Sequence, residues 1–288
     1  MRDLNEETIT AEVVARLAGA TDPRVHQISE ALVRHLHAFL REIEPTQAEW
    51  AAGIDFLTRV GQKCDANRQE FILLSDTLGA SMLVDAINHR TPAGATETTV
   101  LGPFFVEQRK PFPLGENMSE GVDGTPMYVS GTVHSVDGSP ISGATIDVWH
   151  SDEEGFYDVQ QGDELAMRGI FTADAAGRFW FWSVRPKYYP IPDDGPVGEM
   201  LAAQGRHPFR PEHVHFMISA PGFETLVTHV FAEGDPYMDS DVVFGVKNSL
   251  ITPYKKHQAG TAPDGTQVDR GYVELNYDFV LKASGPSA

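Results

Sequence analysis

The sequence contains little cysteine, little positive charge and no long apolar run. Cys64 is its single cysteine, which excludes an intramolecular disulfide framework and a zinc site built from cysteines. Lysine and arginine total 22 against 41 aspartates and glutamates, and the resulting net charge of −19 opposes binding to nucleic acid or anionic lipid. No apolar run reaches the roughly 18 residues of a membrane span, and the N-terminus, MRDLNEETIT, lacks the apolar segment of a secretory signal. We expect a cytoplasmic protein with no nucleic-acid or membrane partner.

Apolar residues are nevertheless plentiful enough for a sizeable core, and in the first third of the chain they follow a helical period. They make up 41% of the 288 residues, which suits one large domain or two smaller ones. Between Val25 and Ile43 they recur every three or four residues. Asp22 before Pro23 fits a helix N-cap. Further helices are predicted over about 46–63 and 66–89, with Gly79 a weak point in the last one.

The rest of the chain has the pattern of short strands. Prolines and glycines interrupt residues 91–125, a connection of a length that is usually functional when it is ordered. From residue 126 to residue 280, runs such as YVSGTVHSV, ATIDVWHS and HVHFMISA are separated by glycine and proline turns, which is typical of a β-sandwich. We predict an α+β protein with a helical N-terminal domain over 1–95, followed over 96–288 by a linker and an all-β sandwich.

Two histidines, His213 and His215, are two residues apart in one of these runs. Side chains at this spacing on a strand leave the same face, so two imidazoles would be presented side by side, as a metal site requires. Imidazole ligands alone suit zinc, copper, iron or nickel. In the alternative interpretation one histidine faces the core and the other has no role, and the pair by itself leaves both interpretations open.

Two tyrosines are placed in irregular backbone at strand ends, where functional sites concentrate. Tyr157 follows WHSDEEGF, and Tyr189 lies in RPKYYPIPDDGP. A phenol has a pKa of about 10, so it binds a metal only where a strong Lewis acid such as Fe(III) lowers that pKa. Two phenolates, two imidazoles and a hydroxide would leave a ferric centre without net charge. Taken singly, each tyrosine is better explained as an ordinary half-buried residue.

The segments WHSDEEGFYD, RPKYYPIPDDGPVG and RPEHVHFMISAPG together resemble the intradiol ring-cleavage dioxygenases, which are non-haem Fe(III) enzymes of the catechol 1,2-dioxygenase type. The resemblance covers nearly the whole chain, and it implies that the sandwich is the catalytic domain. It also implies one Fe(III) per subunit, bound by Tyr157, Tyr189, His213 and His215. Tyr188 is a neighbouring candidate, but the ligand of the family lies three residues after the proline, which selects Tyr189.

Within this family the chain looks like the hydroxyquinol (1,2,4-trihydroxybenzene) 1,2-dioxygenases, through YPIPDDGPVG and TVLGPFFVE. Asp76 stands where this subgroup has an acid and catechol enzymes typically have proline. A carboxylate there can accept a hydrogen bond from the extra ring hydroxyl, worth ~1–3 kcal/mol of discrimination; otherwise Asp76 is a solvated helix residue. The resemblance implies a substrate pocket, with core packing as the alternative, lined by Leu73, Asp76, Val100, Leu101, Gly102, Pro103, Phe104, Ile191, Pro192, Arg210 and Val243.

The implied reaction uses O2 to cleave the ring between its two adjacent hydroxyls. The product would be 3-hydroxy-cis,cis-muconate, which tautomerises to maleylacetate in aromatic catabolism. In the family the second tyrosine, here Tyr189, is displaced from the metal and takes a substrate proton. Arg210 faces the ring, where its permanent charge can stabilise carbanion character; a surface salt bridge is the alternative. His229 stands where catechol relatives commonly have glutamine, so its role is open.

The resemblance further implies a homodimer formed through the N-terminal helices. In the family a phospholipid often occupies an apolar tunnel between the subunits. Ile28, Leu32, Leu36 and Phe39 are candidates for the dimer surface, and packing inside the chain is the equal alternative.

Three other functions stay open at this point. A catechol or chlorocatechol 1,2-dioxygenase would share the site and differ in substrate. A zinc hydrolase would bind its metal through His213, His215 and His229, and it would be colourless where a ferric phenolate protein is red. A non-catalytic β-sandwich binding module would hold no metal and consume no O2.

Overall fold

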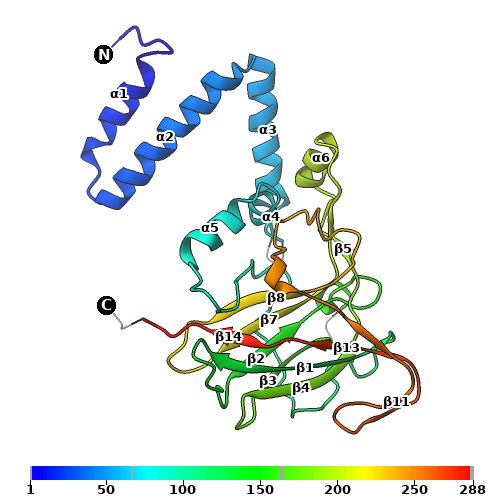
Figure 1. The fold of residues 1–288 in the computed structure, drawn as a ribbon. Helices are drawn as coiled ribbons and strands as arrows, with labels where there is room; N and C mark the ends of the chain where they lie inside the picture. Colours follow the sequence, from blue (N-terminus) through cyan, green and yellow to red (C-terminus); the bar gives the residue numbers. More distant parts are fainter. Residues whose placement is uncertain (1, 66–67, 163–164, 286–288) are drawn as a thin grey trace. The chain divides into compact units, whose positions relative to one another are not determined.

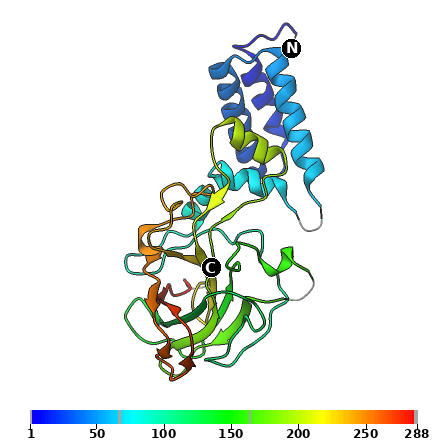
Figure 2. The ribbon, with the colours of Figure 1, turned by 90° about the vertical axis from the view of Figure 1, so that its right-hand side faces the viewer.

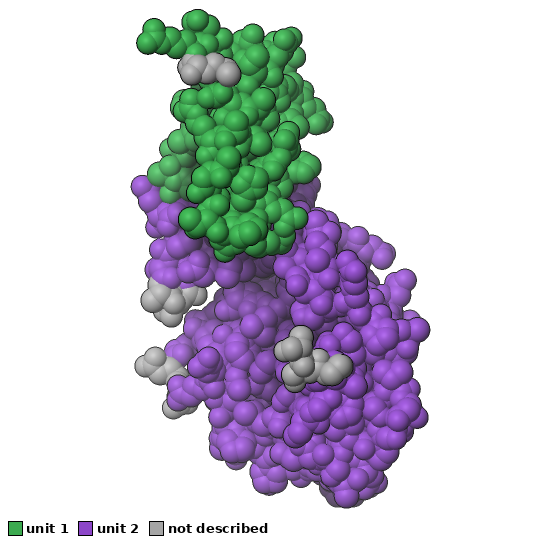
Figure 3. Space-filling model, turned by 90° about the vertical axis from the view of Figure 1, so that its left-hand side faces the viewer, with its two compact units in different colours: residues 1–59 green, residues 60–288 purple. Residues whose placement is uncertain are grey.

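The computed structural model describes residues 2–65, 68–162 and 165–285. The chain forms two compact units, residues 1–59 and 60–288 (Figure 3). The division falls inside helix α3 (Gln47–Lys63), so it does not decide the predicted domain boundary between residues 95 and 96, which stays a prediction. Among the described residues, no helix is both long enough and apolar enough to cross a membrane.

The first unit is helical, as the spacing of its apolar residues predicts. Its elements are α1 (Ile9–Arg16), a 3₁₀ turn (Leu17–Gly19), α2 (Pro23–Ile43) and the first part of α3. The predicted N-cap is confirmed, because the Asp22 carboxylate accepts hydrogen bonds from the backbone N–H groups of Arg24 and Val25 at 2.7 and 3.3 Å. Pro23 occupies the first turn, where its missing N–H costs nothing.

The single helix predicted over 66–89 is wrong, because two helices stand there. α4 (Glu70–Thr77) and α5 (Ala80–Asn88) are separated by Gly79, whose φ of 74° lies in the left-handed region. Glycine adopts this conformation without steric cost, so the break occurs at the residue that weakens the helical pattern. Residues 66–67 of the predicted helix lie outside the described residues.

Two five-stranded sheets form a β-sandwich in the second unit (Figure 1). The first sheet contains β1 (Pro126–Ser135), β4 (Arg178–Val184), β10 (Lys255–His257), β13 (Tyr272–Asn276) and β14 (Phe279–Leu281). The second has the order β3-β2-β7-β8-β9 and contains β2 (Thr145–Trp149), β3 (Arg168–Thr172), β7 (His213–Ser219), β8 (Leu226–Ala232) and β9 (Ile251–Thr252). Phenylalanines that are at most 1% exposed fill the space between the sheets, namely Phe179, Phe181 and Phe279 from the first and Phe171 and Phe216 from the second. The predicted α+β architecture is confirmed.

β1 is the central strand of the first sheet. It pairs antiparallel with β4 along one edge. Along the other edge it pairs in parallel first with β13, over Met127–Ser130, and then with β14, over Val133–Ser135. Gly131 stands at the change of partner, where a Cβ would lie 1.8 Å from the Tyr277 carbonyl oxygen. Only glycine allows the two backbones to approach this closely.

Shorter elements fill the connections between these strands. They are a 3₁₀ turn η2 (Asp158–Gln160), β5 (Tyr189–Pro190), α6 (Pro196–Ala203), β6 (Phe209–Arg210), a 3₁₀ turn (Asn248–Leu250), β11 (Gly260–Thr261) and β12 (Gln267–Val268). The sequence pattern does not anticipate α6. The Glu70 carboxylate accepts a hydrogen bond from the Val197 N–H at 3.2 Å, which attaches the first turn of α6 to α4 (Figure 2).

The long segment 91–125 lies along both sheets. The Thr99 N–H donates to the Val227 carbonyl on β8 at 3.0 Å, and the Met118 N–H donates to the Trp182 carbonyl on β4 at 3.0 Å. The segment is therefore ordered by backbone hydrogen bonds to the sandwich, and its path brings residues 99–104 to the outer face of the second sheet.

Candidate metal centre

The candidate site lies on the outer face of the second sheet. Val214 and Val230 point into the core between the sheets and are fully buried, so alternation along the strands turns His213, His215 and His229 to the opposite face. His215 on β7 stands directly opposite His229 on β8. The predicted shared face of His213 and His215 is confirmed.

The ring of His215 is held by two neighbours that bear no charge. Trp149 stands opposite it on β2, and the indole stacks on the imidazole with ring centroids 4.7 Å apart and an interplanar angle of 16°. Gly102, in the segment before β1, also approaches the ring, because a Cβ at this position would lie only 3.0 Å from His215 Cε1. The fold thus fixes the imidazole by contact rather than by hydrogen bonds to its far nitrogen.

Four polar atoms converge at this point. Tyr157 Oη lies 2.9 Å from His215 Nε2 and 3.4 Å from Tyr189 Oη. His213 Nε2 lies 3.1 Å from His215 Nε2. All four residues are at most 2% exposed. The two tyrosines and two histidines selected from the sequence therefore share one buried cluster, and their action as metal ligands stays a prediction.

A buried ion pair positions Tyr157. Asp158, the next residue, accepts a hydrogen bond from Arg168 Nε at 2.6 Å, and both residues are 3% exposed. Arg168 Nη2 also donates to the Phe104 carbonyl at 3.2 Å, and the Phe104 ring stacks on Tyr157 with centroids 4.4 Å apart. Arg168 therefore binds both segments that enclose the phenol. The sequence reasoning missed it, because nothing in the local pattern links β3 to the tyrosine loop.

Burial keeps the imidazoles neutral. Burial, with the nearby Arg210 charge second, lowers the pKa of His213 and of His229 well below the usual value. Burial followed by the two neighbouring imidazoles does the same to the pKa of His215. His213 Nδ1 lies 2.6 Å from the Pro211 carbonyl oxygen, which can only accept. The proton of His213 is therefore on Nδ1, and the lone pair of Nε2 faces the cluster, as in metal-bound histidines.

Burial, followed by the charge of Tyr189, raises the pKa of Tyr157 well above its usual value. This phenol ionises only if a cation close to its oxygen lowers the pKa again. Neutral imidazoles and two phenols together form a donor set that fits a hard, highly charged metal ion.

Three imidazoles also meet the simplest requirement for a metal site. Ring nitrogens of His213, His215 and His229 all lie within 4.8 Å of one another. His229 Nδ1 is also 3.3 Å from Arg210 Nη2. The geometry therefore offers two overlapping donor sets, one with both tyrosines and one without them.

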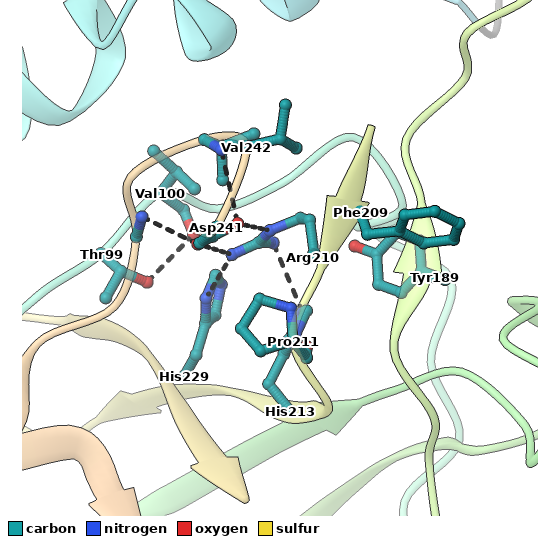
Figure 4. Close-up of polar contacts among 12 residues, drawn as sticks. Thr99, Val100, Tyr189, Phe209, Arg210, Pro211, His213, His229, Asp241 and Val242 are labelled. Atoms are coloured by element: carbon teal, nitrogen blue, oxygen red, sulfur yellow. Dashed lines mark hydrogen bonds and ion pairs between the residues drawn. The ribbon is translucent and has the colours of Figure 1, made fainter. Parts of the chain in front are cut away.

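Arg210 lies inside the site and not on the surface (Figure 4). It is 2% exposed, and its Nη1 is 3.4 Å from His213 Nε2. On the short ladder of β5 and β6 it is paired in register with Tyr189. Its charge is balanced by Asp241, whose Oδ1 lies 3.2 Å from Arg210 Nε. The surface salt bridge considered as an alternative is excluded, and Asp241 is a site residue that sequence reasoning missed.

The predicted pocket residues come from separate segments of the second unit. Leu73 and Asp76 on α4 are 5% and 4% exposed, so Asp76 is not a solvated helix residue. Phe104 contacts Tyr157 as described. The others range from buried to exposed: Ile191 (3%) and Val243 (3%) are buried, Val100, Gly102 and Pro192 are intermediate, and Leu101 (39%) and Pro103 are exposed. That these residues line a substrate pocket stays a prediction.

Tyr188, the neighbouring candidate for a ligand, packs elsewhere. Its ring contacts Tyr237 and Phe209, with centroids 4.9 and 5.8 Å away, and it is partly exposed. Alternation along the backbone turns the two adjacent tyrosines in different directions, so only Tyr189 joins the cluster.

Two family models match the chain and together span most of it. One is described as the catechol dioxygenase N terminus and matches residues 22–96; the other is described as dioxygenase and matches residues 100–283. A hydroxyquinol 1,2-dioxygenase of Rhizobium sp. (strain MTP-10005) is 50% identical, over 96% of this chain and 95% of that protein. A 6-chlorohydroxyquinol 1,2-dioxygenase of Cupriavidus pinatubonensis is also 50% identical, over 98% and 99% of the two chains.

A solved structure agrees with these matches. The crystal structure of hydroxyquinol 1,2-dioxygenase from Pseudomonas putida DLL-E4 superposes with a TM-score of 0.92 and 50% identity, covering 97% of this chain and 99% of that one. The likeness therefore includes the helical N-terminal segment as well as the sandwich.

Proposed function

Since this chain belongs to the intradiol ring-cleavage dioxygenase family, we propose that it is an oxidoreductase that cleaves hydroxyquinol with O2 between its two adjacent hydroxyls. Both oxygen atoms enter the product, 3-hydroxy-cis,cis-muconate, which tautomerises to maleylacetate. One observation carries the proposal: the oxygens of Tyr157 and Tyr189 and the Nε2 atoms of His213 and His215 meet in a buried cluster with neighbouring contacts of 2.9 to 3.4 Å. Relatives named for cleavage of hydroxyquinol and 6-chlorohydroxyquinol match almost the full length.

We assign one Fe(III) per subunit to Tyr157, Tyr189, His213 and His215. When bound, it supplies a Lewis acid that lowers the pKa of the phenols and of the substrate hydroxyls. The residues suit it, because two phenolates compensate much of a trivalent charge and the imidazoles are already neutral. Zinc needs no such anionic compensation and would leave both buried phenols without a role.

Tyr189 and Arg210 act on the substrate in this proposal. Tyr189 Oη, as the phenolate that the bound metal would stabilise, takes one hydroxyl proton from the bound diol; within the cluster it lies 3.4 Å from Tyr157 Oη. Arg210 cannot lose its charge at any pH at which the protein is folded. Because it is buried beside the cluster, its field acts in a dry site on the electron-rich ring, where such stabilisation is strongest.

Asp76 is proposed to recognise the third hydroxyl, which catechol lacks. The carboxyl is buried, and the interactions that act on it include those with Arg210 and with Asp241, so it lies within electrostatic range of the site. A buried carboxylate without a donor is costly. The Ser81 hydroxyl supplies one donor and the third hydroxyl would supply another, so hydroxyquinol is favoured over catechol, which offers none.

The alternatives are less supported. A zinc hydrolase using His213, His215 and His229 would place a divalent cation beside the Arg210 guanidinium with no anionic ligand among the three imidazoles. Catechol or chlorocatechol cleavage would use the same cluster but would gain nothing from a buried acid on α4.

The partners of the enzyme follow from the same assignment. The substrate is a small aromatic triol, and O2 is the second substrate. We propose a homodimer formed through the N-terminal helices, where Ile28, Leu32, Leu36 and Phe39 of α2 are 48–64% exposed, and a phospholipid site in that apolar region. The cytoplasm is the proposed location, in keeping with the single cysteine.

The test is oxygen uptake by the iron-loaded protein, with hydroxyquinol and catechol side by side. We expect a red protein with one iron per chain that consumes one O2 per hydroxyquinol. Tyr157→Phe and His215→Ala should lose iron or reduce turnover by at least about 100-fold, because a ligand is removed. Tyr188→Phe is the matched control, since it removes a phenol oxygen one residue from Tyr189 and outside the cluster, and it should keep both colour and rate.

Three results would contradict the proposal. A colourless protein whose activity depends on zinc would replace it with the hydrolase. Full iron content and full rate in Tyr157→Phe would remove that residue from the site. Faster turnover of catechol than of hydroxyquinol would keep the family and overturn the substrate.

A further inference from the structure

The loop after β8 places one carboxylate at the centre of several contacts. Asp241 is 6% exposed. Its Oδ1 lies 3.2 Å from Arg210 Nε, and its Oδ2 lies 3.4 Å from Arg210 Nη2. The same two oxygens accept backbone N–H groups of Val243 at 3.3 Å and Gly245 at 2.9 Å. One side chain therefore joins the guanidinium to the loop that carries Val243 (Figure 4).

The remaining contacts of Arg210 do not fix it in the same way. Nη1 is 3.4 Å from His213 Nε2 and Nη2 is 3.3 Å from His229 Nδ1, and both of these nitrogens belong to neutral rings. Asp241 is the one anion that the described residues bring into an ion pair with Arg210. An arginine side chain has many rotamers, so the carboxylate decides where the guanidinium points.

The backbone of the loop is shaped to allow this pair. A Cβ at Gly245 would lie 3.0 Å from Arg210 Nη2 and 3.2 Å from Asp241 Oδ2. Gly245 is not in the left-handed region. Glycine is therefore suited to this position because a side chain would crowd the ion pair, and not because of the backbone conformation. A larger residue would push on the ion pair directly.

A second arginine holds the same loop against α4. Arg206 donates from Nη2 to the Val242 carbonyl at 2.9 Å and from Nη1 to the Thr77 carbonyl at 2.7 Å. Thr77 follows Asp76, the proposed specificity residue. The loop is thus tied on one side to the substrate-facing Arg210 and on the other to the end of α4.

We propose that Asp241 is a positioning residue, which aims the Arg210 guanidinium at the aromatic ring and holds Val243 at the edge of the pocket. The proposal rests on the proposed function in one respect, the role of Arg210 toward a bound diol. Asp241 does not touch the reacting atoms; it acts through Arg210. Its effect therefore requires Arg210 to be present, whereas a purely structural effect would not.

The test uses Asp241→Asn in the iron-loaded full chain. The substitution keeps the shape, but an NH2 group replaces one of the two accepting oxygens and the negative charge is lost. Either the contacts of Oδ1 with Arg210 Nε and the Val243 N–H or those of Oδ2 with Arg210 Nη2 and the Gly245 N–H are therefore removed. We expect the anaerobic dissociation constant of 4-nitrocatechol to rise, and kcat with hydroxyquinol to fall, each by about tenfold or more, with iron content unchanged. Asp239→Asn is the matched control: it makes the same charge change two residues earlier at an exposed position, and it should resemble the wild type.

The decisive measurement repeats Asp241→Asn in an Arg210→Gln background. If Asp241 acts through Arg210, the second substitution adds less than about twofold, because coupled residues are not additive. The proposal would be overturned if the effects of Asp241→Asn and Arg210→Gln on the dissociation constant and kcat simply multiplied in the double variant. It would also be overturned if Asp241→Asn alone kept both constants within twofold of the wild type. Should Asp241→Asn not fold, Gly245→Ala decides, since it crowds the ion pair directly; constants equal to the wild type there would overturn it as well.

The two proposals fail in different ways. No O2 uptake by the wild type with hydroxyquinol would remove the proposed function, while the 4-nitrocatechol titration would still report on Asp241 and Arg210. Normal uptake together with an unaffected Asp241→Asn variant would leave the function standing and remove the positioning role.

Discussion

Asp76 is a carboxyl group whose surroundings decide its chemistry. Burial raises its pKa, and the Ser81 hydroxyl and the Arg210 charge oppose that rise in this order. It lies at the end of α4, 4% exposed, next to the segment held by Arg206. The Ser81 hydroxyl is a donor to this acid in the free enzyme, and the third hydroxyl of a bound triol would be a second one.

We expect Asp76→Asn to lower the ratio of kcat/KM for hydroxyquinol to that for catechol by roughly 5- to 20-fold, or about 1–2 kcal/mol. The amide is a weaker acceptor than a carboxylate for the extra hydroxyl. Asparagine is preferred to proline as the test, because Asp76 lies within α4 and proline would remove a helical hydrogen bond. Steady-state kinetics with both substrates gives the ratio.

Asp55→Asn, on the exposed face of α3 with 67% of its side chain accessible, is the control for this charge change. An unchanged ratio in Asp76→Asn would show that Asp76 does not recognise the third hydroxyl, whatever happens to the absolute rates.

Single residues could be predicted where a short-range rule applies to them. Alternation in a strand is enough to place His213 and His215 on one face. Asp241 could not be found in this way, because it belongs to an irregular loop and its partner Arg210 is on another element. Arg168 and Trp149 were not predicted for the same reason. The contacts of Arg168 with the segments around Tyr157, and of Trp149 with His215, exist only after the sheet has formed.

The segment from Thr99 to Phe104 is the element that closes the site over β7. Within it, Gly102 has a φ of 80°, and a Cβ would lie 3.0 Å from His215 Cε1. Gly94, earlier in the same connection, has a φ of 91°, but a Cβ there would meet no atom of the described residues within 4 Å. Both glycines therefore have the left-handed backbone conformation, but only Gly102 lies against the His215 imidazole.

Gly102→Ala should weaken iron retention, because its new methyl group displaces the ring of His215. Both Gly102→Ala and Gly94→Ala should lower the free energy of unfolding by about 1 kcal/mol through backbone strain. Iron content after dialysis against a chelator, together with the melting temperature, separates the two effects. Equal iron retention in both variants would mean that the approach of Gly102 to His215 has no consequence for the metal.

Elements with a strong period were the easiest to anticipate. The capped helix α2 and the strands β2 and β7 follow directly from spacing and turn residues. Their assembly did not: β3 and β4 follow one another through the turn DAAG yet pair with β2 and β1 in different sheets. The order of strands depends on the packing of both sheets on one aromatic core, which no local pattern contains.

At the scale of the whole molecule, the main feature of the N-terminal unit is that the large apolar side chains of α2 are exposed. The apolar stripe of α2 that predicted a helix contains no buried residue in the single chain. Val25, Ile28, Leu32, Leu36, Phe39 and Ile43 all keep about half or more of their surface exposed. Exposed apolar surface of this extent is typical of an interface, and a second copy of the chain is the partner that the family assignment supports.

We expect Leu32→Glu with Leu36→Glu to convert a dimer into a monomer, because two buried charges without partners would cost several kcal/mol at the interface. Sedimentation at micromolar concentration measures the mass. Gln27→Glu adds charge on the opposite face of α2 and should leave the dimer intact. A wild-type chain that sediments as a monomer would end the dimer proposal without affecting the metal site, which lies wholly in the second unit.

The pairing of β1 with β13 and β14 has a consequence for synthesis. β1 begins at Pro126, but the partners of one of its edges, β13 (Tyr272–Asn276) and β14 (Phe279–Leu281), come far later in the chain. On the ribosome, the aromatic interior therefore cannot be sealed before Leu281 has been made. Until then β1 presents an open sheet edge, which is the kind of edge that pairs with other chains.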